Sequence, residues 1–392
     1  MTVFVDLVST IVGTFPLAFE YNVHKDATWI MKGTCMARVN GHLNRRDILR
    51  GFGLGALGLA LGGKSFGPAV ARAATGSPLV DKGQLYKKMA GPAKVSLIKG
   101  NDRRDIVYQA LKKIEDEVLA SVGDKKILIK PNFVSTDHPL AATGVDAIRG
   151  ILDFLKPHYK KQIIVGESTP SEEGAFGGFK NYGYLALEKE YDVELADLNT
   201  RPWEYRYVIG RGNRPLPIRI ISTFLDPDVY IISAAKMKTH DRVVTTLSLK
   251  NVLLGAPLSD SKGNDKGLTH TANNFSREAV LHYNMFHLAQ EIYPDLGIID
   301  GFEAMEGNGP VGGTPVDTRI ALASLDPLAM DILATKLMGF DPSQIMYMTS
   351  MAEAGMGQGD LSKIEVLGTP AEQCQFHFKA NQRMIEPYGL KS

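Results

Sequence analysis

Cysteine is scarce in this chain of 392 residues, which has only Cys35 and Cys374. We expect Cys35 to be absent from the mature protein, because it precedes a segment with the pattern of an export signal. The one remaining thiol cannot form an internal disulfide, and it cannot supply all the ligands of an iron–sulfur cluster. The scarcity of cysteine therefore excludes a disulfide scaffold and an iron–sulfur cluster bound by this chain alone.

The sequence also lacks an excess of charge of one sign and, beyond residue 75, a long apolar run. Its 44 Lys and Arg residues and 43 Asp and Glu residues leave a formal charge of +1, which gives no reason to expect nucleic acid. A membrane-spanning helix takes about 18 or more apolar residues, so we expect no membrane anchor in the mature chain. The apolar content of 44% is typical of a globular protein with one large domain or two smaller ones.

The N-terminal region carries the pattern of a targeting segment. Residues 44–50 (NRRDILR) are followed by the apolar stretch GFGLGALGLALGG and by small residues at Ala71-Arg72-Ala73. This order resembles a twin-arginine export signal, so we expect an exported, periplasmic protein that uses the twin-arginine export machinery. We assign residues 36–73 to the signal and residues 1–35 to an over-extended N-terminus, since Met36 is a more natural start. A buried or membrane-anchoring helix is the alternative.

From residue 94 onward, segments with strand and helix patterns alternate. Short apolar runs predict strands at residues 94–99, 126–130, 162–165, 193–196, 228–235, 296–300 and 319–323. Apolar residues at helical spacing predict helices at residues 102–120, 144–155, 184–189, 277–292 and 327–338. The alternation predicts an α/β fold with a largely parallel central sheet and helices on both faces. We expect a single domain over residues 90–370 and a C-terminal tail over residues 371–392.

Four further features complete the expected fold. Residues 173–180 are rich in glycine and predict a loop, and residues 200–222 predict a hairpin. The polar segment at residues 255–275 predicts a flexible loop or lid near the site. Asp326 directly before Pro327 has the pattern of a helix N-cap.

The stretch of residues 228–255 is the strongest candidate for chemistry. It places Lys236, Lys238 and His240 directly after a predicted strand. Ammonium groups suit a carboxylate or phosphate ligand, a crowded lysine can act as a base through a lowered pKa, and a histidine can move protons. We expect these three residues to be catalytic. Taken singly, the lysines also fit solvated loop charges, and the histidine fits a structural role.

Other predicted strand ends should reach the same edge of the sheet, because ligands of α/β folds bind beyond the carboxyl ends of the strands. We expect the substrate-binding residues to be Lys130, Asn132, Glu167, Ser168, Lys250, Asn251, Gly307, Asn308 and Gly309. The chain has no GxGxxG that opens a helix after a strand, no Walker sequence and no GxSxG elbow. The site therefore does not match these nucleotide-binding or hydrolase patterns.

The segment at residues 300–310 leaves three interpretations open. Asp300, Glu303 and Glu306 offer the oxygen ligands that a divalent cation such as Mg²⁺ or Ca²⁺ prefers, although their spacing is not that of an EF-hand. The backbone N–H groups of its glycines could instead form an anion-binding nest. The third interpretation is a tight turn with exposed acids. The cofactor is thus unknown, with a divalent metal as one candidate.

Five motifs occur in an order and at distances that resemble one known family. They are KPN at residues 130–132, KMKTH at 236–240, SLKNVLLG at 248–255, DGFEAMEGNGPVGG at 300–313 and SLDPLAMDILATKLMGFDP at 324–342. Together they resemble the domain of unknown function 362 family over residues 94–368. The resemblance implies that residues in these motifs, Asp326 and Asp331 among them, hold family positions, but it implies no reaction. Some relatives carry ferredoxin-like cysteine clusters beside this domain, and the cysteines for such a module are missing here.

These observations favour an exported α/β enzyme that acts on a small anionic molecule. In this hypothesis the lysines hold the anion, His240 moves protons and a divalent metal takes part if the acidic segment binds one. The first alternative is a non-catalytic periplasmic ligand-binding or accessory protein that captures a ligand in the same pocket. The second alternative is a partner in an iron–sulfur redox system.

Overall fold

The computed structural model describes residues 3–6, 18–21, 91–270, 277 and 279–390. The chain divides into two compact units, residues 1–78 and residues 79–392. In the first unit, β1 (Val3–Asp6) pairs antiparallel with β2 (Ala18–Tyr21). The expected export signal at residues 36–73, the proposed start at Met36 and Cys35 lie outside the described residues.

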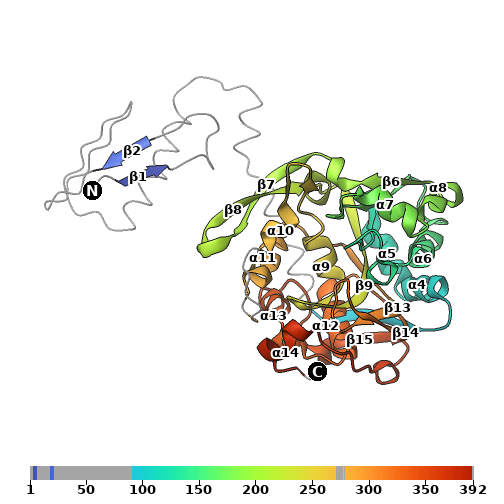
Figure 1. Ribbon diagram of the computed structural model, residues 1–392. Helices are drawn as coiled ribbons and strands as arrows, with labels where there is room; N and C mark the ends of the chain where they lie inside the picture. The colour runs from blue at the N-terminus through green and yellow to red at the C-terminus, as the bar shows by residue number, and fades with distance from the viewer. Residues whose placement is uncertain (1–2, 7–17, 22–90, 271–276, 278, 391–392) are drawn as a thin grey trace, which may run out of the picture. The chain divides into compact units, whose positions relative to one another are not determined.

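A mixed central sheet of nine strands organises the second unit (Figure 1). Eight strands follow the order β15-β3-β14-β13-β9-β4-β5-β6, and β10 pairs with β9. Their bounds are β3 Ala93–Lys99, β4 Lys126–Lys130, β5 Ile163–Glu167, β6 Val193–Asp197, β9 Val229–His240, β10 Val244–Thr246, β13 Leu296–Glu306, β14 Thr314–Ser324 and β15 Ile364–Gly368. β14 runs antiparallel to both neighbours, whereas the run β13-β9-β4-β5-β6 is parallel throughout. The expectation of a largely parallel sheet is therefore confirmed.

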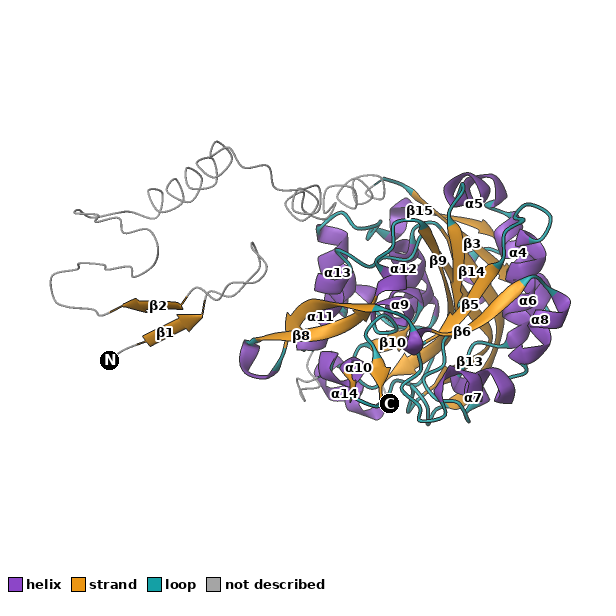
Figure 2. Ribbon diagram, turned by 90° about the horizontal axis from the view of Figure 1, so that it is seen from above, coloured by secondary structure: helices purple, strands orange, loops and turns teal. Residues whose placement is uncertain are grey.

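Helices cover both faces of the sheet, as expected (Figure 2). One face carries α4 Arg103–Lys112, α5 Glu115–Val122, α6 Val145–Leu155, α7 Gly174–Asn181 and α8 Leu187–Glu190. The other carries α9 Ser248–Leu253, α11 Val280–Leu288, α12 Pro327–Leu337, α13 Met346–Glu353 and α14 Gln382–Tyr388. Tyr230 and Ile232 of β9 pack into the first core and Ile231 packs into the second, as the alternation of side chains along a strand requires. No helix among the described residues is long and apolar enough to cross a membrane.

The strand expected to end at residue 235 continues to His240. All twelve residues of β9 are buried, because β13 pairs with it as far as Lys238 and β10 folds back onto Lys238, Thr239 and His240. The polar residues therefore lie in a covered strand and not in a loop that follows it. Since side chains alternate along a strand, Lys236, Lys238 and His240 share one face of the sheet.

Several other boundaries differ from the sequence expectations. The helix expected at residues 102–120 is divided at Ile114 into α4 and α5, and the glycine-rich segment at residues 173–180 forms helix α7 and not a loop. The strands expected at residues 296–300 and 319–323 extend to the full lengths of β13 and β14, because the two pair with each other. The expected hairpin is confirmed as β7 (Trp203–Ile209) and β8 (Pro215–Ile221).

Part of the expected loop at residues 255–275 has regular structure. It contains the short pair β11 (Ser259–Asp260) and β12 (Gly263–Asn264), followed by α10 (Asp265–Thr269). The C-terminal residues do not form a separate tail, since Cys374, Phe378 and Met384 are buried in the second core. Their packing on the sheet is reinforced by Asn381, whose Nδ2 donates to the carbonyl of Gly309 at 2.7 Å.

Candidate functional site

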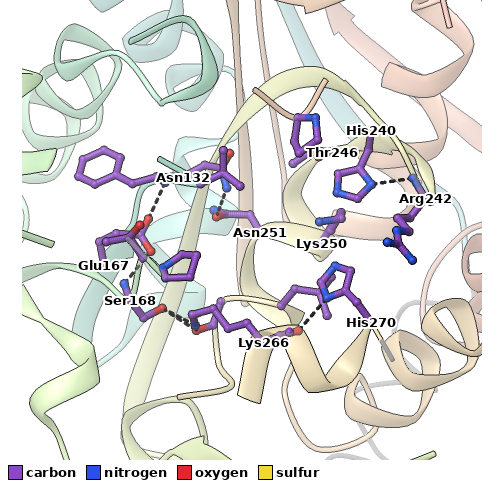
Figure 3. A pocket seen from close by; sticks show the side chains of 18 of the residues that line it. Asn132, Glu167, Ser168, His240, Arg242, Thr246, Lys250, Asn251, Lys266 and His270 are labelled. Atoms are coloured by element: carbon purple, nitrogen blue, oxygen red, sulfur yellow. Dashed lines mark hydrogen bonds between the residues drawn. The ribbon is translucent and has the colours of Figure 1, made fainter. Parts of the chain in front are cut away.

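A cavity of about 350 Å³ lies at the carboxyl ends of β4, β5 and β9 (Figure 3). It is lined by polar and charged side chains from those strand ends, from α9 and from the segment that contains α10. The lining residues are Lys130, Asn132, Phe133, Val134, Glu167, Ser168, Thr169, Pro170, His240, Asp241, Arg242, Thr246, Lys250, Asn251, Leu254, Gly255, Asn264, Lys266, Gly267, His270 and Pro310. Four lysines or arginines face two acids there, so the cavity has an excess of positive charge.

The structure brings seven of the expected site residues to this cavity. They are Lys130, Asn132, Glu167, Ser168, His240, Lys250 and Asn251. The remaining expected residues do not line it, and they are Lys236, Lys238, Asp300, Glu303, Glu306, Gly307, Asn308 and Gly309. The strand-end residues thus divide into one group around the cavity and another beside it.

Lys130 and Glu167 form a buried ion pair that joins the ends of β4 and β5. Lys130 Nζ donates to Glu167 Oε1 at 2.9 Å, to Asn251 Oδ1 at 3.1 Å and to the carbonyl of Pro131 at 3.0 Å. Because an ammonium group has three N–H bonds, none remains for a ligand. Glu167 is equally occupied, since its other oxygen accepts the N–H of Phe133 at 2.8 Å. This pair therefore holds the wall of the cavity together.

Lys266 is also fully engaged. Its Nζ donates to the carbonyls of Gly255 and Pro257 and to Ser168 Oγ, so all three N–H bonds have acceptors. None of these acceptors is a carboxylate, and burial lowers the pKa of Lys266 to about 7. Lys266 therefore ties the α10 segment to the end of β5, while its charge still faces the cavity.

Lys250 differs from both of these lysines. It is 8% exposed and lines the cavity, yet its Nζ makes no hydrogen bond to any residue that the structure describes. Burial lowers its pKa to about 8, partly opposed by the negative charge of Asp241. Lys250 thus carries the lining ammonium group whose N–H bonds are available to an anion. Figure 3 shows it between the rings of His240 and His270.

The two histidines present different nitrogens to the cavity. His240 Nδ1 accepts the backbone N–H of Arg242 at 3.0 Å, which leaves the proton of a neutral ring on Nε2. His270 Nδ1 donates to the carbonyl of Lys266 at 2.7 Å, which leaves a lone pair on Nε2. The ring centroids are 6.4 Å apart. Burial and the charge of Lys250 lower both pKa values, that of His270 to about 4, so both rings are neutral near pH 7.

Two further polar atoms of the lining have no partner among the described residues. They are Asn132 Oδ1 and Thr246 Oγ1, both buried. The orientation of the Asn132 amide follows from its neighbour: Asn251 Oδ1 already accepts from Lys130, so Asn132 must turn its Nδ2 toward that oxygen, at 3.1 Å. Unpaired buried polar atoms are costly, which makes both atoms candidates for ligand contacts.

Lys236 and Asp300 belong to the group beside the cavity. Asp300 is buried, and it interacts with Lys236 Nζ at 3.8 Å, with Arg103 Nε at 3.2 Å and with the backbone N–H of Gly144 at 2.9 Å. Burial lowers the pKa of Lys236, partly opposed by Asp300. Lys238 Nζ donates to the carbonyl of Ala141 at 2.6 Å, and burial lowers its pKa well below the usual value. Both ammonium groups therefore have polar contacts inside the fold, and neither lysine lines the cavity.

The acids expected to hold a metal are not assembled into one site. The carboxylate of Asp300 already pairs with Arg103 and Lys236. Glu303 is exposed, and Glu306 Oε2 accepts the backbone N–H of Lys379 at 2.9 Å. Within the described part of the chain, no group of three or more His, Cys, Asp or Glu side chains is placed to hold a metal ion. The reason is the extension of β13 through Glu306, which separates side chains that a loop could have gathered.

The glycine turn after β13 supports the end of β9. Thr239 Oγ1 donates to the carbonyl of Gly307 at 2.9 Å. A Cβ at Gly309 would lie 2.1 Å from the carbonyl oxygen of Thr239, so this close approach requires glycine. Asn308 is exposed. The turn therefore contributes to the cavity through Pro310, and its glycines serve packing.

Sequence reasoning missed Arg242, Thr246, Lys266 and His270. Lys266 and His270 lie in the segment that was expected to be a flexible loop near the site. Their spacing of four residues was a usable signal, because residues i and i+4 share a face if the segment is helical. Thr246 offered no such signal, since its position depends on the pairing of β10 with β9.

The fold and the site together define an α/β protein with a cationic cavity at the carboxyl edge of a mostly parallel sheet. The chain belongs to the family described as Domain of unknown function (DUF362), whose model matches residues 127–336. The thylakoid-associated protein sll1697 of Synechocystis is 29% identical over 241 residues, which cover 60% of this chain and 69% of that protein.

Two solved structures are also similar to this chain. The lactate racemase apoprotein of Thermoanaerobacterium thermosaccharolyticum has a TM-score of 0.33 and 14% identity, over 54% of this chain and 51% of that one. A protein of Thermotoga maritima has a TM-score of 0.36 and 10% identity, over 66% of this chain and 60% of that one. The matches thus span about half and three fifths of the two solved chains.

Proposed function

We propose that this protein is an enzyme that binds a small anionic molecule at Lys250 and moves a proton on it. The observation that carries the proposal is the buried ammonium group of Lys250, without a hydrogen-bond partner among the described residues, between two neutral imidazoles. A buried charge is costly when it is unpaired, so a carboxylate or phosphate that pairs with Lys250 would relieve that cost. Lys130 and Lys266 have no free N–H and would support the site without holding the ligand.

The tautomers of the two histidines suggest separate roles. The lone pair on His270 Nε2 can accept a proton from the bound molecule, which makes His270 the proposed general base. The N–H on His240 Nε2 can donate a hydrogen bond to negative charge that develops on the molecule as the proton leaves. Lys250 would stabilise the same charge. A preorganised hydrogen-bond donor and a cation aimed at the developing charge are effective at this task.

The first test of this proposal is anion binding. Calorimetric titration of the full chain with a panel of small carboxylates and phosphates, with acetamide as the neutral control, should identify anions that bind. Lys250→Met should weaken their binding by more than about tenfold, because it removes a charged hydrogen-bond donor. Anions that bind Lys250→Met as tightly as the unchanged protein would overturn the proposed anion site.

The second test separates an enzyme from a binding protein. Each bound anion is incubated with the protein in D₂O, and deuterium that enters carbon-bound positions is measured by NMR. We expect exchange that is lost in His270→Gln, with anion binding largely kept. Binding without exchange for every anion of the panel is the result expected of a periplasmic capture protein, and it would overturn the catalytic part of the proposal.

We also propose that the chain is exported through the twin-arginine machinery. This rests on the pattern at residues 44–73, in which the pair Arg45-Arg46 precedes an apolar glycine-rich stretch and small residues. Cell fractionation tests it, since changing both arginines to lysine should keep the protein in the cytoplasm. A protein that is retained inside the cell with the arginine pair intact would contradict export.

A further inference from the structure

The hairpin of β7 and β8 displays an aromatic stripe on one face. Trp203, Tyr205 and Tyr207 alternate along β7, so they share the face that points away from the core, and they are 41%, 58% and 58% exposed. Pro217 lies opposite Tyr207 on β8 and is exposed as well. Figures 1 and 2 both show the hairpin projecting from the body of the domain. A projecting ribbon with three exposed aromatic side chains is unusual on a surface without a partner.

The hairpin is held rigidly, so the stripe has a fixed direction. Asn284 of α11 accepts the backbone N–H of Ile209 at 2.8 Å and donates to the carbonyl of the same residue at 3.0 Å. Arg206, on the opposite face of β7, pairs with Glu291. Arg219 is bound by two carboxylates, Asp265 at 2.9 Å and Asp260 at 2.8 Å, so its single positive charge faces two negative ones. These contacts fasten the hairpin from its tip to its base.

The charges around the stripe favour an anionic partner. The turn that joins the two strands carries Arg211 and Arg214, which are exposed and form no ion pair with any described residue. The one acid of β7, Glu204, belongs to the opposite face and lies 3.1 Å from Arg206. The aromatic face therefore ends in two uncompensated positive charges.

We propose that this hairpin docks on the surface of a lipid bilayer that contains anionic headgroups. Tyrosine and tryptophan place an apolar ring and a polar tip at the same depth, and they concentrate at the boundary between acyl chains and headgroups. Arginines at the tip attract anionic phosphates. The stripe lies on a hairpin that projects from the domain, a position from which it can reach a planar surface. This contact is peripheral and does not span the membrane.

The two tryptophans of the chain allow a direct test, because Trp29→Phe leaves Trp203 as the sole tryptophan. The full chain with this change is mixed with vesicles of phosphatidylcholine alone or of phosphatidylcholine with phosphatidylglycerol. We expect the fluorescence of Trp203 to shift to shorter wavelength with the anionic vesicles, and phosphatidylcholine brominated on its acyl chains to quench it. Arg211→Gln and Arg214→Gln should each weaken vesicle binding by about fivefold.

Phe176→Ala removes another aromatic ring, 51% exposed on α7, and should leave vesicle binding unchanged. Vesicles that bind the chain without any effect on Trp203 would show that another segment makes the contact, and they would overturn the proposal. Absence of binding to anionic vesicles would overturn it too, and the stripe would then be a surface for a protein. Because the quenching measurement uses the unchanged hairpin, a folding defect in a variant cannot account for either result.

Discussion

Asp331 of α12 accepts a hydrogen bond of 2.9 Å from the backbone N–H of Ser248, the first residue of α9. Its second carboxylate oxygen accepts the N–H of Leu249 at 2.8 Å. A helix of six residues is too short to be stable on its own, so this contact holds the turn that carries Lys250. Asp331 is fully buried and does not line the cavity, so it positions the proposed anion site from outside.

Asp331→Asn should therefore weaken both the fold and the site. The amide keeps the shape of the carboxylate but offers a single acceptor oxygen, so one of the two buried N–H groups loses its partner. We expect a loss of about 1–3 kcal/mol in the free energy of unfolding, measured by urea denaturation, and weaker anion binding at Lys250. Asp360→Asn is the matched control, because Asp360 also caps a turn, through the N–H of Ser362 at 3.0 Å, but at an exposed position. Unchanged anion affinity in Asp331→Asn would contradict the positioning role.

The affinity for an anion should depend on pH through Lys250. Its pKa is about 8, and the anion needs the charged ammonium group, so binding should be strong below pH 8 and weaken as the pH rises through it. Once the amine is mostly neutral, each further pH unit should cost about a factor of ten. Lys250→Arg keeps its charge across this range, so its anion binding should lose the pH dependence that comes from residue 250 and keep only the smaller contribution of Lys266 near pH 7. Calorimetry at a series of pH values measures both profiles, and identical profiles would contradict the assignment.

His270 should make the protein sensitive to acid. Its pKa is lowered from 6.5 to about 4, so between these values the unfolded chain binds a proton that the folded protein does not. The free energy of unfolding should therefore fall as the pH is lowered through this window. His270→Gln removes this contribution and should flatten the dependence of urea denaturation on pH. An unchanged dependence on pH in His270→Gln would contradict this assignment.

The buried pair of Lys130 and Glu167 should be costly to break from one side. Both side chains are almost inaccessible, at 2% and 3% exposure, so Glu167→Gln leaves a buried ammonium group without its counter-charge. We expect a loss of about 3–5 kcal/mol in the free energy of unfolding. The exposed pair of Lys94 and Glu117 is the control, and Glu117→Gln should cost far less, because water screens the exposed charges. Equal losses in the two variants would contradict the structural role given to Lys130.

The sequence predicted the layers of this fold well because local patterns determine them. The apolar run at Tyr230, Ile231 and Ile232 required a strand buried on both faces, and the helical spacing in residues 144–155 required an amphipathic helix. Strand ends were harder to predict. β9 continues through Lys236, Lys238 and His240 because β10 and β13 pair with it, and those pairings come from segments that are distant along the chain.

For the candidate site, too, the sequence predicted the general location, and contacts between distant segments decided the details. The rule that ligands collect at the carboxyl ends of parallel strands was enough to bring Lys130, Glu167 and His240 to one cavity. The rule could not distinguish a lysine that holds a ligand from one that holds the wall, because that depends on how many N–H bonds already have acceptors. Lys130 has three acceptors, whereas Lys250 has none among the described residues.

By itself, the sequence determined the α/β class, the family motifs and the edge of the sheet where the polar residues meet, because periodicity and motif order are properties of the chain. The tertiary structure decided which of those residues are free to act. Burial and hydrogen bonding turned Lys236, Lys238 and Asp300 into packing partners and added His270 to the cavity. They left Lys250 as a buried charge without a hydrogen-bond partner among the described residues. The physical reason is that the availability of a polar group depends on its neighbours in space, and the neighbours of Lys250 come from β9, β10 and the α10 segment.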